Sequence, residues 1–410
     1  MKSPLFSTLS LACGVLFLTL SVNAHAFENW PTWRGPLATG HTDETELPVK
    51  WSAENIQWKV DVGGRGQSSP IIWGDKIFLT SAHDKGNKRS VSCIDMSGKV
   101  LWQKIAWEGE PELVHNMNPW ASASCVTDGE RVVAFFGKGG IHCYDFDGKL
   151  LWTKDLGKFD GPWGTAASPI IVGDLVIQNC DADDQSYIIA LNKKNGETVW
   201  KTDREIVRGW STPILVETKE RTELVMNGHH GVNSYDPKTG KELWFCKGDT
   251  GRGTPTVVPY GETLIAVNGR PGAMFAVKPG GSGQVNDSHE VWRTRRGIGR
   301  DLPSPLIIGD YLLVVSLKPG IAVSYNAKTG EELDKVRLSG EFSASPIAAD
   351  GLAYIPNEDG EVFVIRPGKK IEIVARNKVN SGDDEIFRAS ITPLGGKLYL
   401  RSDKTLYCIK

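Results

Sequence analysis

A short pattern recurs along this chain at nearly regular intervals: a serine or threonine, usually followed by proline, then an apolar run and a glycine turn. The clearest copies begin at Ser69, Ser168 and Ser304, and each of them continues through Pro and three apolar residues to Gly-Asp. Weaker copies, one with cysteine in place of proline, bring the total to eight; they are Ser124-Cys125, Thr212-Pro213, Thr254-Pro255, Ser345-Pro346 and Thr392-Pro393. A repeat of roughly 40–50 residues built from short strands is typical of the blades of a β-propeller.

A second pattern recurs between the anchors, with Asp or Asn, then Gly, then a strand that contains tryptophan, and in two degenerate copies Leu333 or Val374 stands in its place. The tryptophans are Trp58, Trp102, Trp152, Trp200, Trp244 and Trp292. Asx and Gly suit a turn between the third and fourth strands, and proline is tolerated at the first residue of a strand. Large rings at one fixed position indicate packing between neighbouring blades, and we favour this over the alternative that the tryptophans enclose a cofactor.

The strand count predicts how the ring closes. The last repeat begins at Ile391 and stops after three strands, whereas residues 56–62 form a spare outer strand before the first anchor. We therefore predict that strand 56–62 completes the last blade, which leaves no exposed edge at the join. The predicted fold is all-β: an eight-bladed propeller of four-stranded antiparallel blades. A seven-bladed ring would require the Cys125 copy to be spurious, but complete strands follow it.

The first 26 residues have the features of a signal peptide: a basic residue at Lys2, an apolar stretch over 9–22 and the small-x-small site that ends at Ala26. We expect cleavage after Ala26, export to the periplasm and no transmembrane segment in the mature chain. An uncleaved anchor and a lipid attached to Cys13 are the alternatives. The predicted domains are the signal peptide at 1–26, an N-terminal extension at 27–50 and a single propeller at 51–410.

Charge and cysteines narrow the possible functions. The 47 Lys and Arg residues nearly balance the 49 Asp and Glu residues, so no basic excess favours nucleic acid as a partner. Cys93, Cys143 and Cys408 occupy the same position in different repeats, where neighbouring blades are too far apart for a disulfide. We expect these three to be buried thiols. The pairing of the other cysteines is left open.

The repeats that end in Trp200 and Trp244, Ala-Leu-Asn-Lys-Lys-Asn-Gly-Glu-Thr-Val-Trp and Ser-Tyr-Asp-Pro-Lys-Thr-Gly-Lys-Glu-Leu-Trp, resemble the pyrroloquinoline-quinone (PQQ) type repeat. The resemblance extends over 51–410 and implies an eight-bladed propeller whose outer tryptophans dock neighbouring blades. One branch of that family, the quinoprotein dehydrogenases, holds PQQ and Ca²⁺ over the central channel. The other is non-catalytic and is typified by the outer-membrane protein assembly factor BamB. The segment from Trp30 to Pro36, Trp-Pro-Thr-Trp-Arg-Gly-Pro, also resembles the N-terminal tag of PQQ-like propellers common in planctomycete genomes.

The chemistry of an enzyme is sparse in this sequence. The dehydrogenases stack PQQ on a disulfide between adjacent cysteines, and this chain has neither adjacent cysteines nor a Cys-x-x-Cys-His haem site. We predict no catalytic residue, no metal site and no cofactor, with a PQQ- and Ca²⁺-dependent dehydrogenase that lacks this disulfide as the alternative. Two acid- or histidine-rich loops could also bind a metal, although ordinary loops are favoured; their residues are Asp181, Asp183 and Asp184, and His229 and His230 with His83 as a partner.

The loops that lead from the outermost strand of one blade to the innermost strand of the next gather around one mouth of the channel of a propeller. In this chain those eight loops are rich in glycine, arginine and tryptophan. The candidate binding residues are Arg65, Gln67, Trp120, Trp163, Arg208, Trp210, Arg252, Arg300 and Arg388. Arginine and tryptophan dominate binding hot spots. The alternative is that these side chains fill the channel and pair with local acids such as Asp301.

These observations predict a non-enzymatic binding or scaffold protein of the cell envelope. Its ligand would be an envelope protein, a peptide or an anionic small molecule, bound at the arginine- and tryptophan-lined channel mouth. We expect the protein to be a monomer.

Overall fold

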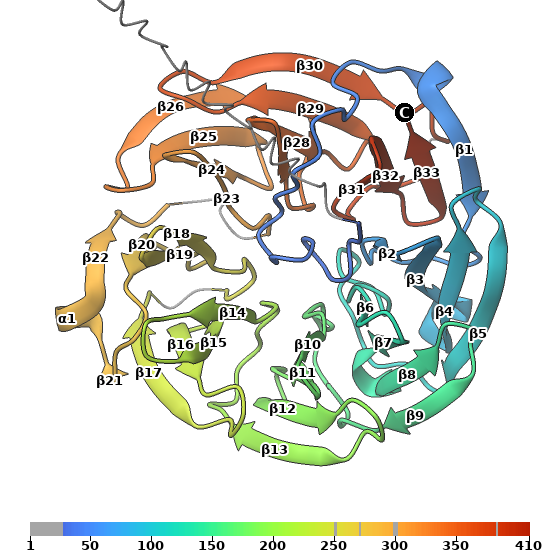
Figure 1. The fold of residues 1–410 in the computed structure, drawn as a ribbon, viewed down its shortest axis with the longest axis horizontal. Helices are drawn as coiled ribbons and strands as arrows, with labels where there is room; N and C mark the ends of the chain where they lie inside the picture. Colours follow the sequence, from blue (N-terminus) through green and yellow to red (C-terminus); the bar gives the residue numbers. More distant parts are fainter. Residues whose placement is uncertain (1–27, 250–251, 270–271, 298–301, 383) are drawn as a thin grey trace, which may run out of the picture.

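The computed structural model describes residues 28–249, 252–269, 272–297, 302–382 and 384–410. It is a ring of eight antiparallel sheets around a central channel, as predicted (Figure 1). In every blade the first strand lies innermost and the fourth lies at the rim.

The blades follow one another along the chain. Blades 1 to 4 comprise β2 (Ile71–Trp73), β3 (Lys76–His83), β4 (Lys88–Asp95) and β5 (Val100–Glu108); β6 (Val126–Thr127), β7 (Arg131–Phe135), β8 (Ile141–Asp145) and β9 (Leu150–Lys154); β10 (Ile170–Val172), β11 (Leu175–Asn179), β12 (Tyr187–Asn192) and β13 (Thr198–Asp203); β14 (Ile214–Glu217), β15 (Thr222–Asn227), β16 (Gly231–Tyr235) and β17 (Glu242–Lys247). Blades 5 to 8 comprise β18 (Val258–Tyr260), β19 (Thr263–Val267), β20 (Met274–Val277) and β22 (Glu290–Arg293); β23 (Leu306–Ile308), β24 (Tyr311–Val315), β25 (Ile321–Asn326) and β26 (Glu332–Arg337); β27 (Ile347–Ala349), β28 (Leu352–Pro356), β29 (Glu361–Arg366) and β30 (Glu372–Lys378); β31 (Thr392–Leu394), β32 (Lys397–Arg401), β33 (Thr405–Ile409) and β1 (Ile56–Asp61). Short helical turns are η1 (Ala53–Asn55), η2 (Asp84–Gly86), η3 (Gly137–Gly139) and α1 (Asn286–His289).

The ring closes as the strand count predicted. Strand β1, from the N-terminal part of the chain, pairs antiparallel with β33, and Trp58 lies opposite Cys408. The pairing continues past the strand, because the Val62 amide donates to the Lys404 carbonyl at 2.9 Å. Blade 8 therefore takes three strands from the end of the chain and its outer strand from the beginning.

Two of the eight sequence anchors were placed two residues away from their structural equivalents. In blade 5 the position that matches Ser69 is Thr256, not Thr254, and in blade 8 it is Ser390, not Thr392. Side chains that are two residues apart lie on the same face of a strand, so a nearby Thr-Pro has the same pattern as the true anchor. Proline is therefore not part of what defines the anchor.

Outer tryptophans join neighbouring blades at five junctions, and the prediction that they pack between blades is confirmed. The Trp102 indole nitrogen donates to the Phe146 carbonyl at 2.9 Å, and Trp152 donates to the Lys193 carbonyl at 2.9 Å. Trp58, Trp200 and Trp292 make the equivalent bond to the turn of the following blade. Each of these rings also packs on the glycine of that turn. The interior consists of apolar clusters, and one of them runs through blades 2 and 3.

Trp244 is the exception, because the turn that would receive it has been expanded. Its ring is fully buried, and its indole nitrogen donates to the Glu223 carboxylate at 2.6 Å. That carboxylate also accepts bonds from Ser234 and from the side chain of Arg221. The chain between β20 and β22 forms β21 (Gly283–Gln284), which adds a parallel fifth strand to blade 4.

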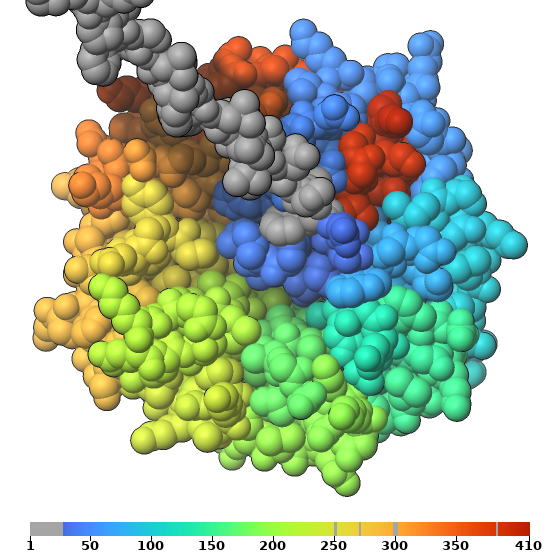
Figure 2. Space-filling view, viewed as in Figure 1, coloured from blue at the N-terminus to red at the C-terminus, as the bar shows by residue number. Residues whose placement is uncertain are grey.

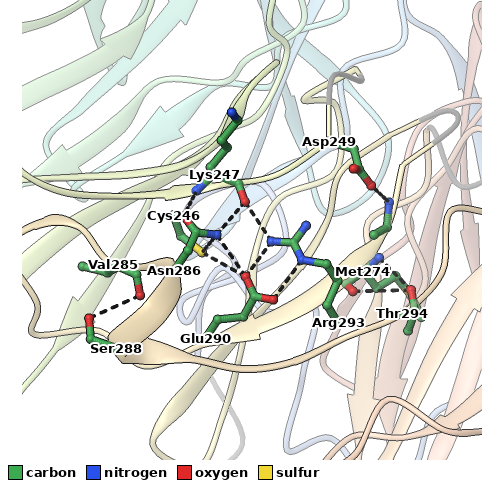
Figure 3. A network of polar contacts seen from close by, with 11 residues as sticks. Cys246, Lys247, Asp249, Met274, Val285, Asn286, Ser288, Glu290, Arg293 and Thr294 are labelled. Carbon is green, nitrogen blue, oxygen red and sulfur yellow. Dashed lines mark hydrogen bonds and ion pairs between the residues drawn. The ribbon is translucent and has the colours of Figure 1, made fainter.

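A polar network fixes this expanded connection to blade 4 (Figure 3). The Asn286 amide accepts from the Lys247 N–H at 2.8 Å and donates to the Lys247 carbonyl at 2.9 Å. Arg293 donates to the same carbonyl at 2.8 Å and pairs with Glu290 at 2.6 Å. Blades 4 and 5 are therefore joined by polar contacts where five other junctions use a tryptophan and a glycine.

The contact between tryptophan and glycine predicts a large difference between two Gly→Ala variants. Gly196 (φ +73°) and Gly173 (φ +58°) both have left-handed backbones, but a Cβ at Gly196 would lie 2.7 Å from the Trp152 ring, and one at Gly173 would meet nothing within 4 Å. We expect Gly173→Ala to reduce the free energy of unfolding by about 1 kcal/mol because of backbone strain alone. Gly196→Ala should lose roughly 1–3 kcal/mol more because the ring must move. Urea unfolding of both variants measures the difference, and equal losses would contradict this role for the ring.

Candidate functional site

The two ends of the channel differ. Residues 28–50 cross the centre of the ring at the end where the first and second strands of each blade are joined (Figures 1 and 2). The Glu44 carboxylate accepts bonds from the Gly395 and Gly396 amides, at 2.5 and 2.9 Å, in the turn of blade 8. Trp30 forms a β-bridge with Ile72 in blade 1, and His41 forms one with Ala348 in blade 7. This N-terminal segment therefore closes that end of the channel.

A cavity of about 410 Å³ lies inside the channel, between this segment and the opposite end. Trp33 of the N-terminal segment lines it, so we call this side the floor. Five of the residues proposed from the sequence line the same cavity: Gln67, Trp163, Trp210, Arg252 and Arg388. They lie in the loops between blades, which form the open end. We call this end the channel mouth.

The anchor hydroxyls form a belt around the cavity wall. The Ser69 amide donates to the Ser124 hydroxyl at 2.8 Å, and the Ser124 amide donates to the Ser168 hydroxyl at 3.0 Å. The same bond joins further neighbouring blades, and the Ser390 amide of blade 8 donates to the Ser69 hydroxyl of blade 1 at 3.0 Å. Between blades 4 and 5 the Thr256 hydroxyl donates to the Thr212 carbonyl at 2.5 Å. The anchors from which these amides donate are Ser69, Ser124, Ser168, Thr256, Ser304, Ser345 and Ser390. The belt explains why the sequence repeats a hydroxyl residue at this position.

Trp163 is the centre of a cationic and aromatic cluster at the mouth. The guanidinium groups of Arg208 and Arg252 lie 5.4 and 5.3 Å from the centroid of its ring, and His115 stacks on it at 5.1 Å. Distances of this size allow cation–π attraction. The indole nitrogen of Trp210 donates to the Gly164 carbonyl at 2.9 Å, which ties two neighbouring mouth loops together.

Three of the predicted arginines form ion pairs with acidic side chains. Such pairs were expected under the alternative that these arginines fill the channel. Arg65 pairs with Asp403, Arg208 pairs with Asp183 at 2.8 Å, and Arg388 pairs with Glu358 at 2.8 Å. These pairs lower the positive charge of the mouth but fix the guanidinium groups in place. Arg300 and Asp301 lie outside the described residues.

A second cavity, of about 570 Å³, lies beside the first where blade 8 meets blade 1. Arg65 and Trp120 line it, and it shares Gln67 and Arg388 with the channel cavity. With its amide oriented so that both ends are bonded, Gln67 donates to the Met117 carbonyl at 2.9 Å and accepts from Arg388 at 3.2 Å. The mouth therefore has two adjoining hollows.

Several residues that line the channel cavity were not predicted from the sequence, and three of them have large side chains that can contact a ligand. His115 and Met117 belong to the long loop between β5 and β6, and Trp33 belongs to the N-terminal segment. Glu112 anchors this loop to β4, because it forms a buried ion pair with Arg89. The Glu112 carbonyl also accepts from the Trp120 indole at 2.9 Å. The signal that could have revealed Trp33 was its place in the Trp-Pro-Thr-Trp motif.

The acidic and histidine-rich loops do not form a metal site within the described part of the chain, where no group of three or more His, Cys, Asp or Glu side chains could hold an ion. Asp181 was assigned to an ordinary loop, but its side chain is buried and pairs with Arg204 at 3.0 Å. Burial raises the pKa of its carboxyl, and the arginine opposes this rise. His83 instead makes a hydrogen bond with Ser90 at 2.8 Å.

The six cysteines of the described chain are all free and buried, as expected for Cys93, Cys143 and Cys408. Burial raises the pKa of the Cys93, Cys125, Cys143 and Cys246 thiols to about 12. Thiols of this kind are poor nucleophiles at neutral pH.

In the residues that the structure describes, no helix has the length and apolar character to cross a membrane.

The family and the two relatives that match this chain in sequence carry the same name. The family described as outer membrane protein assembly factor BamB matches residues 87–257 and 283–367. The BamB of Moranella endobia is 27% identical over 176 residues, which are 42% of this chain and 41% of that protein. The BamB of Alkalilimnicola ehrlichii is 24% identical over 154 residues, 37% of this chain and 36% of that protein. The chain thus spans about two fifths of the length of the curated relatives it matches.

Solved structures of low sequence identity share the fold. The crystal structure of BamB from Moraxella catarrhalis has a TM-score of 0.63 at 17% identity and covers 86% of this chain and 98% of its own. A europium-containing methanol dehydrogenase has a TM-score of 0.69 at 13% identity, with 91% and 89% covered. The quinohemoprotein alcohol dehydrogenase from Comamonas testosteroni has a TM-score of 0.66 at 10% identity, with 94% and 81% covered. Two dehydrogenases and a BamB therefore share this architecture. The family match in sequence covers more than half of the chain, and the protein belongs to the family of the outer membrane protein assembly factor BamB.

Proposed function

We propose that this protein is a non-catalytic binding or scaffold propeller of the cell envelope, which holds a partner at its channel mouth. The observation on which the proposal rests is the asymmetry of the channel. One end is closed by the N-terminal segment, and the other opens into two hollows lined by arginine, tryptophan and amide side chains. Concave sites with a few placed polar groups are typical binding sites. Membership of the BamB family supports a role among envelope proteins.

The proposed binding residues are those inferred from the sequence, together with the side chains that the fold brings beside them. The set is Arg65, Gln67, Trp120, Trp163, Arg208, Trp210, Arg252 and Arg388, with His115 and Met117 added; Arg300 belongs to the proposal from sequence alone. The partner would be an envelope protein, a peptide or an anionic small molecule. We further propose that residues 1–26 are a signal peptide removed on export, that residues 51–410 form one domain and that the protein is a periplasmic monomer.

The alternative, a PQQ- and Ca²⁺-dependent dehydrogenase, finds little support in the donor groups of the channel. The described residues that line the channel cavity include no aspartate or glutamate, whereas Ca²⁺ prefers carboxylate and carbonyl oxygens. The cysteines are free, buried and far apart in sequence, so no adjacent pair can form the disulfide on which PQQ is stacked in the quinoprotein dehydrogenases. These residues do not fit the cofactor, and we derive no reaction through it.

A triple variant tests the proposal. We expect Arg65→Gln, Arg208→Gln and Arg252→Gln together to abolish most capture of the partner from an envelope extract, because Arg side chains supply much of the binding energy at such surfaces. The control removes the same charge elsewhere, through glutamine at the exposed Arg337, Arg366 and Arg376 of blades 6 and 7. Both variants should show the unfolding midpoint of the parent protein. Equal capture by the two triple variants would contradict a partner site at the mouth.

A further inference from the structure

The wall of the channel cavity is rich in hydrogen-bond donors. Seven of its lining hydroxyls belong to the belt: Ser69, Ser124, Ser168, Thr212, Ser304, Ser345 and Ser390. Each of these oxygens already accepts a bond from a backbone amide of the neighbouring blade. The hydroxyl proton is then left to donate, and a ligand inside the ring can accept it. A ring of such donors suits a ligand group that only accepts hydrogen bonds.

Among the described residues that line this cavity, Arg252 and Arg388 carry positive charge, and none is an aspartate or a glutamate. Glu358, which does not line the cavity, pairs with Arg388 at 2.8 Å. A further positive charge lies at the floor. The Arg34 guanidinium is 5.8 Å from the centroid of the Trp33 ring and is almost completely buried.

Arg34 is a charged residue that is buried with part of its guanidinium group not hydrogen-bonded. Its Nη2 donates to the carbonyl oxygens of Thr39 and Pro305, both at 2.7 Å, while its Nε and Nη1 have no hydrogen-bond partner. Burial lowers the pKa of this guanidinium to about 9, and none of the described carboxylates forms an ion pair with it. A buried cation without an ion-pair partner is unfavourable unless a negative charge lies close by. Trp33 lines the cavity and lies beside Arg34, so an anion in the cavity would place a negative charge in this neighbourhood.

The shape of the cavity restricts what can bring an anion to it. About 410 Å³ has room for a small group or a few residues and no room for a folded domain. The N-terminal segment closes the floor, so an extended chain cannot pass through the channel and can only insert one of its ends. Trp163, Trp210 and Trp33 present apolar rings around the inserted group.

We infer that the channel binds the free C-terminal carboxylate of an extended peptide segment, inserted through the mouth toward the belt of hydroxyls. The blind end selects a chain terminus, and the donors and positive charges select a carboxylate over an amine. This inference rests on the proposed function, since it specifies which part of the partner the mouth receives.

The test uses the mature protein and two N-acetylated peptide libraries with five randomised C-terminal positions, one ending in a free carboxylate and the other in a carboxamide. Binding is measured by calorimetry and by the change in tryptophan fluorescence. We expect the free acids to bind and the amides to bind roughly ten- to a hundred-fold more weakly, as is typical for the loss of a charge-assisted hydrogen bond. Arg252→Gln should weaken the free acids by a similar factor, and Arg366→Gln should leave them unchanged.

A second pair of variants examines the belt. Thr212→Ser keeps the hydroxyl and should keep the affinity for free acids, whereas Thr212→Val removes it and should weaken that affinity with little change in amide binding. Equal affinity for acids and amides, or no binding of either library, would overturn the inference. Acetate or inorganic phosphate that binds as tightly as the peptides would also overturn it, because the site would then hold a small anion. Failure of the proposed function is distinguishable, since only that failure leaves partner capture unchanged in the triple arginine variant.

Discussion

Glu112→Ala is expected to lower the free energy of unfolding by about 3–5 kcal/mol, which is the usual loss when one partner of a buried ion pair is removed. Arg89 and Glu112 are both buried, and two guanidinium nitrogens bond to the two carboxylate oxygens. Arg89 also lies over the Trp107 ring, 4.5 Å from its centroid. Without Glu112 the arginine would remain buried with no negative partner. Urea unfolding monitored by tryptophan fluorescence measures the loss.

A double variant separates the charge from the packing. Arg89→Met with Glu112→Leu removes both charges and keeps apolar volume, so we expect it to recover most of the stability lost in Glu112→Ala. The pair also fixes the loop that brings His115 and Met117 to the channel cavity. Glu112→Ala should therefore reduce binding at the mouth even below the temperature at which it unfolds. A loss of stability under about 1 kcal/mol would show that the pair is not what anchors this loop.

Val60→Pro is expected to destabilise the closed ring strongly, whereas Lys59→Pro should have a much smaller effect. The Val62 amide donates to the Lys404 carbonyl, and hydrogen-bonded pairs alternate in antiparallel strands. The pair of Val60 with Leu406, two residues away, is therefore also hydrogen-bonded, while the Lys59 amide points to the free edge of the sheet. Proline is tolerated only where an edge strand needs no donor.

The comparison of these two prolines tests ring closure itself, because both place the same residue in the same strand. For Val60→Pro we expect a loss of roughly 1–3 kcal/mol for the unpaired Leu406 carbonyl, in addition to the strain that both variants share. Unfolding midpoints of the two variants give the difference. Should Lys59→Pro be the more damaging, the register of the closing strand would be wrong.

The fold was predictable from the sequence because each blade repeats the same local chemistry. The hydroxyl anchor and the outer tryptophan recur where a bond between blades is needed, and counting them revealed that strand β1 belongs to the last blade. The register of blades 5 and 8 was harder to predict. In these blades a Thr-Pro pair two residues away matches the sequence pattern, whereas Thr256 and Ser390 make the bonds to the neighbouring blades.

The candidate site was predictable only where it follows from the repeat. The loops between blades must meet at one mouth, so Trp163 and Arg252 could be placed there from their positions in the sequence. The closed floor could not be predicted, because residues 28–50 lie outside the repeat and contact blades that are distant in the chain. The acidic partners of the mouth arginines could not be predicted either. Asp183, for example, lies in the loop between β11 and β12, within a blade, and not in a loop between blades.

The central claim is that partners bind at the mouth and not at the closed end, and site-specific photo-crosslinking tests it most directly. The photoreactive residue p-benzoylphenylalanine would replace Met117, which lines the channel cavity, or Leu37, which is 60% exposed on the N-terminal segment. After irradiation in intact cells, the account predicts a discrete adduct from position 117 that disappears in the triple arginine variant, and none from position 37. Adducts from position 37 alone, or adducts from position 117 that persist in that variant, would contradict it.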